Sequence, residues 1–380
     1  MAGEALQALV DRWVRPEVRA LAPYAVPPGG DLIKLDAMEN PYGWPPGLVE
    51  AWLERLRRVP LNRYPDPEAA ELQAGLRRVL GVPETAALVL GNGSDELIQM
   101  VLLALAGPGR TALAPEPTFS MYRILATACG LRYVGVPLGE GFALDGPALL
   151  EALERHRPAV LFLACPNNPT GNLFDPAWVE RLLEAAPGLV VVDEAYAPFC
   201  EATWLDRAGG HPRLLVLRTL SKLGLAGLRL GLLAGPPAWL EQIGKLRLPY
   251  NIGVLNQASA LFALEHWGVL EGQARRIRAD RARLERALKD RCRGERAGVT
   301  AVYPSQANFV LFRVRPGHAE AVFEGLRRRG VLIRLLHGAG PGLEDCLRVT
   351  VGTPEENAAF LEALDGALAA APVDSGGGAR

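Results

Sequence analysis

Chemistry that needs a free amine has few candidates in this chain, because only four of its 41 basic residues are lysine. Arginine stays protonated in proteins. Lys245 and Lys289 lie in helical patterns, and Lys34 lies in an alternating, strand-like segment, so all three are predicted at the surface. Lys222 instead follows the apolar run Leu214–Leu217 and precedes an apolar, glycine-rich segment. Burying a lysine there is costly unless it is ion-paired, deprotonated or covalently used, and the residue alone does not choose among these.

The polar residues around Lys222 in the sequence favour a reactive amine. Asp193 ends the apolar run LVVVD, and Tyr196 follows three positions later. Asn168 stands in the loop PNNPTG after another apolar run, and Arg229 is seven residues beyond the lysine. In an open parallel sheet, ligands bind at the carboxyl ends of the strands. We therefore expect these side chains to meet in one crevice.

The elements that must position these residues follow from the hydrophobic pattern. Between residues 86 and 235, short and almost continuously apolar runs alternate with amphipathic helical patterns. The expected strands include Ala86–Leu90, Ala159–Cys165, Leu189–Val192 and Leu214–Leu217. Helices are expected around Leu72–Leu80 and after the cap and proline of Asp175-Pro176. The pattern predicts an α/β fold whose large domain has a mostly parallel central sheet with helices on both faces.

The remainder of the chain predicts a second, smaller α/β unit. One long helical stretch is expected from about Gln257 to Arg291, and its charged second half is the expected connector. The other expected elements are a strand at Ala307–Phe312, a helix at Ala319–Arg329, a strand at Cys346–Val351 and a helix opened by Thr353-Pro354. We predict a large domain over residues 34–264. The small domain would combine residues 1–33 with 265–380.

Composition excludes several classes of function. Acidic residues number 42 against 41 basic ones, so the net charge of −1 predicts neither a nucleic-acid nor a membrane partner. The five cysteines are scattered without a C-x-x-C pair, which predicts neither disulfides nor a metal site and fits a reducing cytosol. No secretory signal or membrane span is visible, so we expect a cytoplasmic protein.

The segments NPTG, DEAY and Ser221–Arg229 together resemble class I and II aminotransferases, which are pyridoxal 5′-phosphate enzymes of fold type I. The resemblance covers nearly the whole chain. It implies that Lys222 bonds covalently to the cofactor and then shuttles the substrate α-proton. It implies that Asp193 faces the pyridine nitrogen, and that Tyr196 and Asn168 contact the phenolate oxygen.

The same resemblance implies a phosphate site at the start of a helix in GNGSDE. Arg229 would supply a guanidinium fork, and Phe119 would stack on the cofactor ring. The implied cofactor-binding set is Gly93, Ser94, Asp95, Phe119, Asn168, Asp193, Tyr196, Thr219, Ser221, Lys222 and Arg229. The catalytic residues would be Lys222, Asp193 and Tyr196.

Segments near the two ends resemble the histidinol-phosphate aminotransferases, namely IKLDAMENPYG, NRYPDP and CLRVTVGTPEEN. Met38 replaces the asparagine usual in the first of these. The resemblance implies amino transfer between L-histidinol phosphate and 2-oxoglutarate, in histidine biosynthesis, by a homodimer. The implied substrate-binding residues are Tyr24, Tyr64, Asn168, Arg334 and Arg348, with Tyr64 contributed across the dimer.

Other functions stay open at this point. An aromatic or broad-specificity aminotransferase and a threonine-phosphate decarboxylase share much of the pattern. A non-catalytic ligand sensor needs a DNA-binding module, and only about 30 residues precede the first family motif. A dinucleotide-dependent dehydrogenase is poorly supported, because GNGSDE lacks the third glycine of G-x-G-x-x-G.

Overall fold

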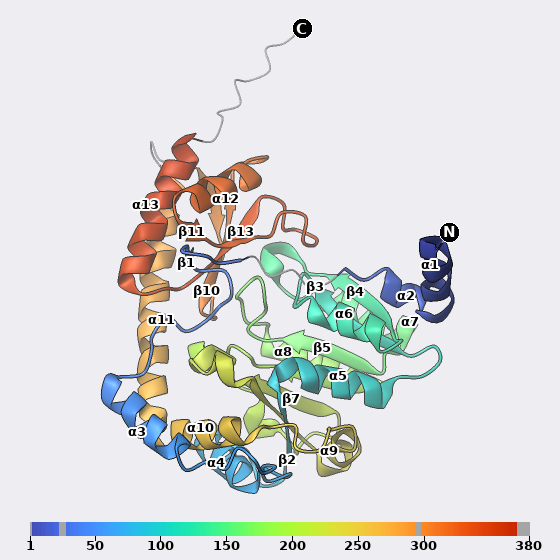
Figure 1. Cartoon of the computed structure of the whole chain (residues 1–380). Helices are drawn as coiled ribbons and strands as arrows, with labels where there is room; N and C mark the ends of the chain where they lie inside the picture. Colours follow the sequence, from blue (N-terminus) through green and yellow to red (C-terminus); the bar gives the residue numbers. More distant parts are fainter. Residues whose placement is uncertain (1, 23–27, 294–297, 371–380) are drawn as a thin grey trace.

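A seven-stranded sheet forms the centre of the computed structural model, which describes residues 2–22, 28–293 and 298–370 (Figure 1). The strand order is β2 (Ala87–Asn92), β8 (Leu230–Gly235), β7 (Leu214–Thr219), β6 (Leu189–Asp193), β5 (Val160–Ala164), β3 (Thr111–Glu116) and β4 (Arg132–Pro137). Only β8 runs antiparallel to its neighbours. The predicted α/β fold with a mostly parallel sheet is confirmed.

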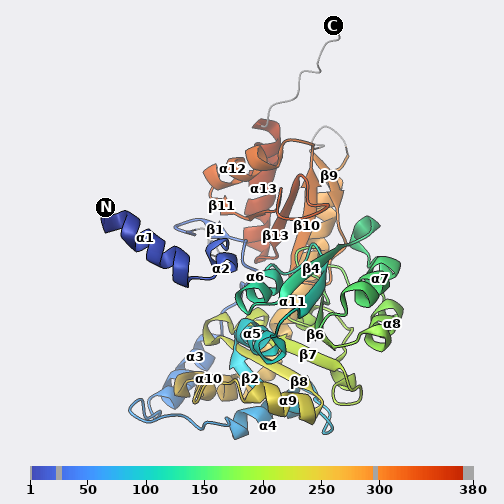
Figure 2. The same ribbon diagram turned by 90° about the vertical axis from the view of Figure 1, so that its right-hand side faces the viewer.

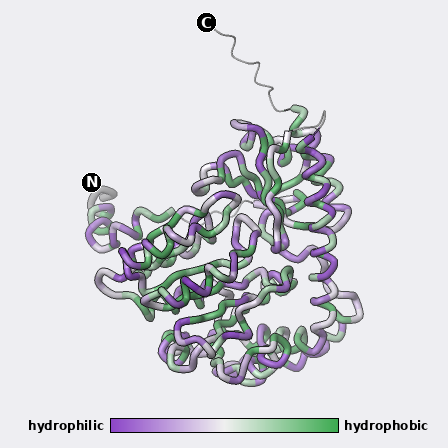
Figure 3. Tube along the Cα trace, turned by 180° about the vertical axis from the view of Figure 1, so that it is seen from behind, coloured by the Kyte–Doolittle hydropathy of each residue, from purple (hydrophilic) through white to green (hydrophobic). Residues whose placement is uncertain are grey.

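Both faces of this sheet are buried, which explains the continuous apolar runs. In β6, Val190 and Val192 join one core while Leu189 and Val191 join the other. The second core also contains residues of α5 (Gly93–Leu105), α6 (Met121–Ala128) and α9 (Pro237–Gly244). The first contains residues of α4 (Ala70–Leu80), α7 (Gly146–His156), α8 (Pro176–Ala185) and α10 (Val254–Glu265). Figure 2 shows these helices around the sheet, and Figure 3 shows hydrophobic segments running through the interior of the fold.

The single long helix expected from Gln257 to Arg291 is wrong, because the structure has two helices there. The chain leaves α10 at His266, whose φ and ψ are −111° and 27°, and α11 (Trp267–Asp290) then begins. The His266 ring packs 4.5 Å from the ring of Phe262, which holds the corner. The break sends α10 along the large sheet and α11 toward the C-terminal unit (Figure 1). Apolar periodicity alone did not reveal it.

The C-terminal unit has a four-stranded antiparallel sheet and a two-stranded parallel one. The first contains β12 (Arg334–Leu335), β13 (Cys346–Thr350), β10 (Phe309–Val314) and β9 (Val299–Val302). The second pairs β1 (Ile33–Lys34) with β11 (Val331–Leu332). Helices α12 (Ala319–Arg328) and α13 (Pro354–Ala370) complete it. Thr353 and Glu356 cap α13 reciprocally, as the sequence TPEE suggests.

The remaining elements are short or lie toward the N-terminus. They are α1 (Ala2–Trp13), α2 (Pro16–Arg19), α3 (Pro46–Leu56), and the 3-10 turns η1 (Glu140–Phe142), η2 (Ala197–Phe199), η3 (Leu205–Arg207), η4 (Ser221–Leu223) and η5 (Ala226–Leu228). Over the described residues, none of the helices combines the length and the apolar character needed to cross a membrane. The division into domains at residues 33/34 and 264/265 stays a prediction.

Candidate active site

The carboxyl ends of β5, β6 and β7 meet at one cavity of about 100 Å³. Asp193 is the last residue of β6, Asn168 lies in the loop after β5, and Lys222 lies in the turn after β7. Parallel strands bring these loops to one edge of the sheet, as expected. The predicted residues that line this cavity are Ser94, Asp95, Phe119, Asn168, Asp193, Tyr196, Thr219, Ser221, Lys222 and Arg229.

Asp193 is a buried carboxyl group that faces this cavity. Its side chain is 4% exposed, and burial raises its pKa from 3.8 to about 6. Two hydrogen bonds oppose the shift. The Tyr122 hydroxyl donates to Oδ2 over 2.7 Å, and the Ala195 amide donates to Oδ1 over 3.0 Å. In its ionised form, the Asp193 carboxylate can pair with a cationic group that binds inside the cavity.

Tyr122 is a functional candidate that the sequence analysis missed. It lies in α6, is fully buried and stacks on Phe162 at 4.7 Å. Burial and the neighbouring Asp193 raise the pKa of its hydroxyl well above the usual value, so Tyr122 stays a hydrogen-bond donor. The available signal was a polar aromatic on the apolar face of a helix, three residues after Phe119. That pattern is ordinary in a protein core, and only the contact with Asp193 distinguishes it.

Lys222 carries an amine that is unusually easy to deprotonate. Burial, with a smaller contribution from Arg348, lowers its pKa from 10.5 to about 8. Its Nζ donates to the carbonyl of Ala37 over 3.3 Å and lies 5.8 Å from the centre of the Tyr196 ring. Near neutral pH an appreciable fraction of this lysine is therefore a neutral nucleophile.

The start of α5 and the turn after β7 form a compact anion cradle. Gly93 has φ of +79°, and a Cβ on it would lie 2.6 Å from Nη2 of Arg229. A Cβ on Gly231 would lie 2.7 Å from the Gly93 carbonyl carbon. Arg229 pairs with Asp95 over 3.2 Å and approaches the Ser221 hydroxyl at 3.5 Å. Gly93 thus belongs to the cradle through its backbone, although it is absent from the lining side chains.

A second cavity, of about 160 Å³, adjoins the first and shares Met38, Phe119 and Asn168 with it. Arg334 and Arg348 line it, together with the apolar side chains of Leu335, Leu336, Ala339 and Leu343. The two arginines are register partners on adjacent antiparallel strands, so their side chains share one face of the sheet. Arg348 is 6% exposed and donates to Asn168 Oδ1 and to the Asp36 carbonyl.

One predicted substrate residue, Tyr64, does not line either cavity in the described structure. Tyr64 is 80% exposed and stacks on Tyr250 with the ring centres 4.4 Å apart. Tyr24 lies outside the described residues. Met38 lies at the junction of the two cavities, with its amide donating to Thr350 Oγ1 and its carbonyl accepting from Asn308.

Comparison with known families identifies the family to which the chain belongs. The profile described as aminotransferase class I and II matches residues 30–364. The chain belongs to the class I and II aminotransferases. It is 58% identical over 355 residues to histidinol-phosphate aminotransferase 2 of Nitrosococcus oceani, covering 93% of this chain and 97% of that protein.

A second sequence relative agrees with this assignment, and a solved structure shows the same fold. Histidinol-phosphate aminotransferase 2 of Cupriavidus pinatubonensis is 51% identical, with 95% of this chain and 98% of that protein covered. The crystal structure of histidinol-phosphate aminotransferase from Sinorhizobium meliloti in complex with pyridoxal 5′-phosphate has the same fold. Its TM-score is 0.82 at 24% identity, with 94% and 98% of the two chains covered.

Proposed function

We propose that this aminotransferase binds pyridoxal 5′-phosphate in the cavity around Lys222. The residues that line the cavity fit three parts of this cofactor, namely its phosphate, its ring nitrogen and the carbon that bonds to lysine. The cradle of Gly93, Ser221 and Arg229 suits a phosphate dianion, and the buried Asp193 suits a protonated ring nitrogen. Lys222, with its lowered pKa, suits the covalent attachment.

The chain's own residues would bind, orient and protonate in this reaction. The cofactor, when bound, accepts the electron pair released at the substrate Cα. Asp193 would hold a proton on the ring nitrogen through its carboxylate, which accepts hydrogen bonds from Tyr122 and the Ala195 amide. Tyr196 and Asn168 line the same cavity as Lys222. The free amine of Lys222 would move the substrate α-proton, first as base and then as acid.

We further propose that the reaction is amino transfer between L-histidinol phosphate and 2-oxoglutarate. The observation that carries this proposal is the pair Arg334 and Arg348, placed side by side in the adjoining cavity. A guanidinium pair suits a phosphate in one half-reaction and a carboxylate in the other. The apolar wall of that cavity suits the imidazole ring. The names of the relatives support the same substrate.

A panel of amino donors with 2-oxoglutarate tests this assignment. We expect kcat/KM with L-histidinol phosphate to exceed that with phenylalanine or tyrosine by at least about 100-fold, since the latter lack the phosphate that the arginines bind. Equal values would instead indicate an aromatic or broad-specificity aminotransferase. Release of carbon dioxide from phosphothreonine without a keto acid would indicate a decarboxylase.

Replacement of Tyr122 by phenylalanine is expected to weaken pyridoxal phosphate binding by about tenfold, because a hydrogen bond to a charged group contributes about 1.5 kcal/mol or more. Its removal also raises the pKa of Asp193 further, which disfavours the carboxylate that the ring nitrogen needs. Equilibrium dialysis of the cofactor measures the effect. Tyr133→Phe, on the neighbouring β4, is the matched control and should bind normally. Equal affinity in the two variants would contradict the role given to Tyr122.

The rate at which the cofactor attaches to the apoprotein should depend on pH through Lys222. Only the neutral amine reacts, and its pKa of about 8 means that the neutral fraction falls about tenfold per pH unit below that value. Stopped-flow absorbance should therefore show a rate that rises up to about pH 8 and then levels. A rate that keeps rising toward pH 10.5, the ordinary lysine value, would contradict the lowered pKa.

We also propose a homodimer in which Tyr64 serves the partner's site. Leu61, Tyr64 and Leu248 are 71%, 80% and 68% exposed, an unusual exposure for apolar side chains. Co-expression of Tyr64→Phe with Lys222→Ala, each on a differently tagged chain, tests this. Hybrid dimers would contain one intact site, so an equal mixture should recover about a quarter of wild-type activity. Activity no higher than the sum of the two separate variants would contradict the proposal.

A further inference from the structure

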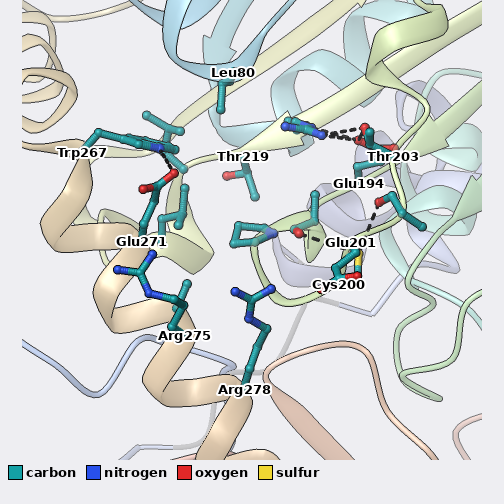
Figure 4. Close-up of a pocket in the computed structure, with 17 residues that line it drawn as sticks. Leu80, Glu194, Cys200, Glu201, Thr203, Thr219, Trp267, Glu271, Arg275 and Arg278 are labelled. Carbon is teal, nitrogen blue, oxygen red and sulfur yellow. Dashed lines mark hydrogen bonds and ion pairs between the residues drawn. The ribbon is translucent and has the colours of Figure 1, made fainter.

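A cavity of about 310 Å³, larger than the proposed cofactor site, lies between α11 and the loops after β6 and β7 (Figure 4). Trp267 and Ala274 border it from α11, while Leu220 and Leu223 border it from the turn after β7. The Trp267 indole donates to Glu271 over 3.2 Å, which orients the ring beside the cavity. A space of this size with an aromatic and aliphatic wall suits a small organic molecule.

The charged groups around this cavity fall into two sets. Glu194 is satisfied, because it accepts from Arg218, from Thr203 and from the Trp204 amide. Its ion pair with Arg218 is held within 2.8 Å, and Glu194 is 1% exposed. Glu194 and Arg218 therefore neutralise each other within the fold and leave the other charged groups to contact a ligand.

The second set comprises Arg275 and Arg278 on α11, Glu271 one turn earlier, and Glu201 on the opposite loop. Figure 4 shows Arg278 extending from α11 into the space below that loop. In the part of the chain that the structure describes, these two guanidinium groups form no ion pair within 4.0 Å with either carboxylate. Two charged groups of each sign thus line one cavity without an ion pair among them; Arg278 is half-buried, while Arg275, Glu271 and Glu201 also reach solvent.

Cysteine chemistry does not explain the cavity. Burial raises the pKa of Cys200 to about 11, so its thiol stays protonated. The thiol lies within donating distance of the carbonyls of Ala202, at 3.4 Å, and Ala197, at 3.7 Å, on its own loop. Recognition in this cavity must therefore rest on ionic groups and apolar contacts.

We propose that this cavity is a second ligand site, which binds an α-amino acid with an apolar or aromatic side chain. The carboxylate would lie between Arg275 and Arg278, the ammonium would face Glu271 or Glu201, and the side chain would rest against Trp267 and the leucines. A zwitterion matches two cationic and two anionic groups better than an anion does. The carboxylates of Glu271 and Glu201 would repel an anion and would gain no cationic partner from it. We name this site the α11 site.

The α11 site shares a wall with the proposed cofactor site. Thr219, at the end of β7, lines both cavities, and its hydroxyl lies 2.9 Å from that of Ser221 in the cradle. Glu194, which lines the α11 site, directly follows Asp193. An amino acid bound in the α11 site would therefore lie beside Thr219 and Glu194. These residues lie at the ends of the strands that position the catalytic residues.

Counting bound ligand in the holoenzyme tests the proposal. The probe is α-methyl-L-phenylalanine, which has no α-hydrogen and so is not transaminated. Equilibrium dialysis should find one fewer probe molecule per chain in the double variant Arg275→Gln/Arg278→Gln than in the wild type, whatever binds at the active site. Each single variant should lower the affinity for the probe at the α11 site by about tenfold, as expected for the loss of one charge-assisted contact.

Arg276→Gln is the matched control. Arg276 also lies in α11, but its guanidinium lies over the Tyr42 ring at 5.7 Å, outside the cavity. This variant should bind the same number of probe molecules as the wild type. An equal count in wild type and double variant overturns the proposal, as does the same loss in Arg276→Gln. Failure of the proposed histidinol-phosphate activity is seen separately, in the donor panel, and leaves this count unaffected.

Discussion

Replacement of Lys222 by alanine is expected to lower kcat for transamination by at least about 10⁴-fold, because it removes both the covalent attachment and the general base. The structure offers no substitute nearby, since Lys34, Lys245 and Lys289 are exposed elsewhere and line neither of the two adjoining cavities. Steady-state rates with L-histidinol phosphate and 2-oxoglutarate measure the loss. Addition of a small primary amine should restore part of the activity, since it supplies the missing base.

Lys245→Ala is the control for this experiment. Lys245 caps α9 and its Nζ donates to Gln242 over 2.6 Å at the surface, so its loss should leave kcat unchanged. A Lys222→Ala protein that kept a tenth of wild-type activity would remove the lysine from the mechanism. It would also remove the proposed cofactor linkage, because the same amine serves both purposes.

Replacement of Asp193 by asparagine is expected to lower kcat by about 10³-fold. An amide cannot hold a proton on the ring nitrogen, and preorganised groups of this kind contribute about that factor. The amide is similar in size, its oxygen can still accept from the Ala195 amide, and the Tyr122 hydroxyl can rotate to accept from the new NH2 group, so the fold should survive. Rapid-quench measurement of the first turnover isolates this chemical step.

Asp206→Asn is the matched control, since Asp206 is an exposed carboxylate in η3. The variant should retain wild-type kcat. An Asp193→Asn enzyme within about threefold of wild type would show that the buried carboxylate contributes no electrostatic stabilisation. The cofactor would then have to be placed differently in the cavity.

The predicted fold was most accurate where the local pattern matched the tertiary environment. The runs at residues 159–165, 189–192 and 214–217 are strands β5, β6 and β7 within a few residues, because a strand buried on both faces must be apolar throughout. The break at His266 was missed for the opposite reason. Helices α10 and α11 have compatible apolar spacing, and the corner depends on how each packs against other elements.

The residues themselves determined the chemistry that this protein can perform. A single lysine after a buried run, with Asp193 and Asn168 at the ends of two other runs, already implied one site, because parallel strands end at a common edge. Arg229, seven residues beyond the lysine, was expected in the same crevice. Residue type and order along the chain were sufficient for that inference.

Only the tertiary structure decided which side chains support and extend the site. Tyr122 reaches Asp193 because α6 packs on the sheet face that buries Phe162 and Val191, and the two bonded residues are 71 positions apart. Arg334 and Arg348 share one wall because β12 and β13 pair in a particular register. Such contacts depend on packing and register between distant segments, and the local sequence at either end does not encode the partner.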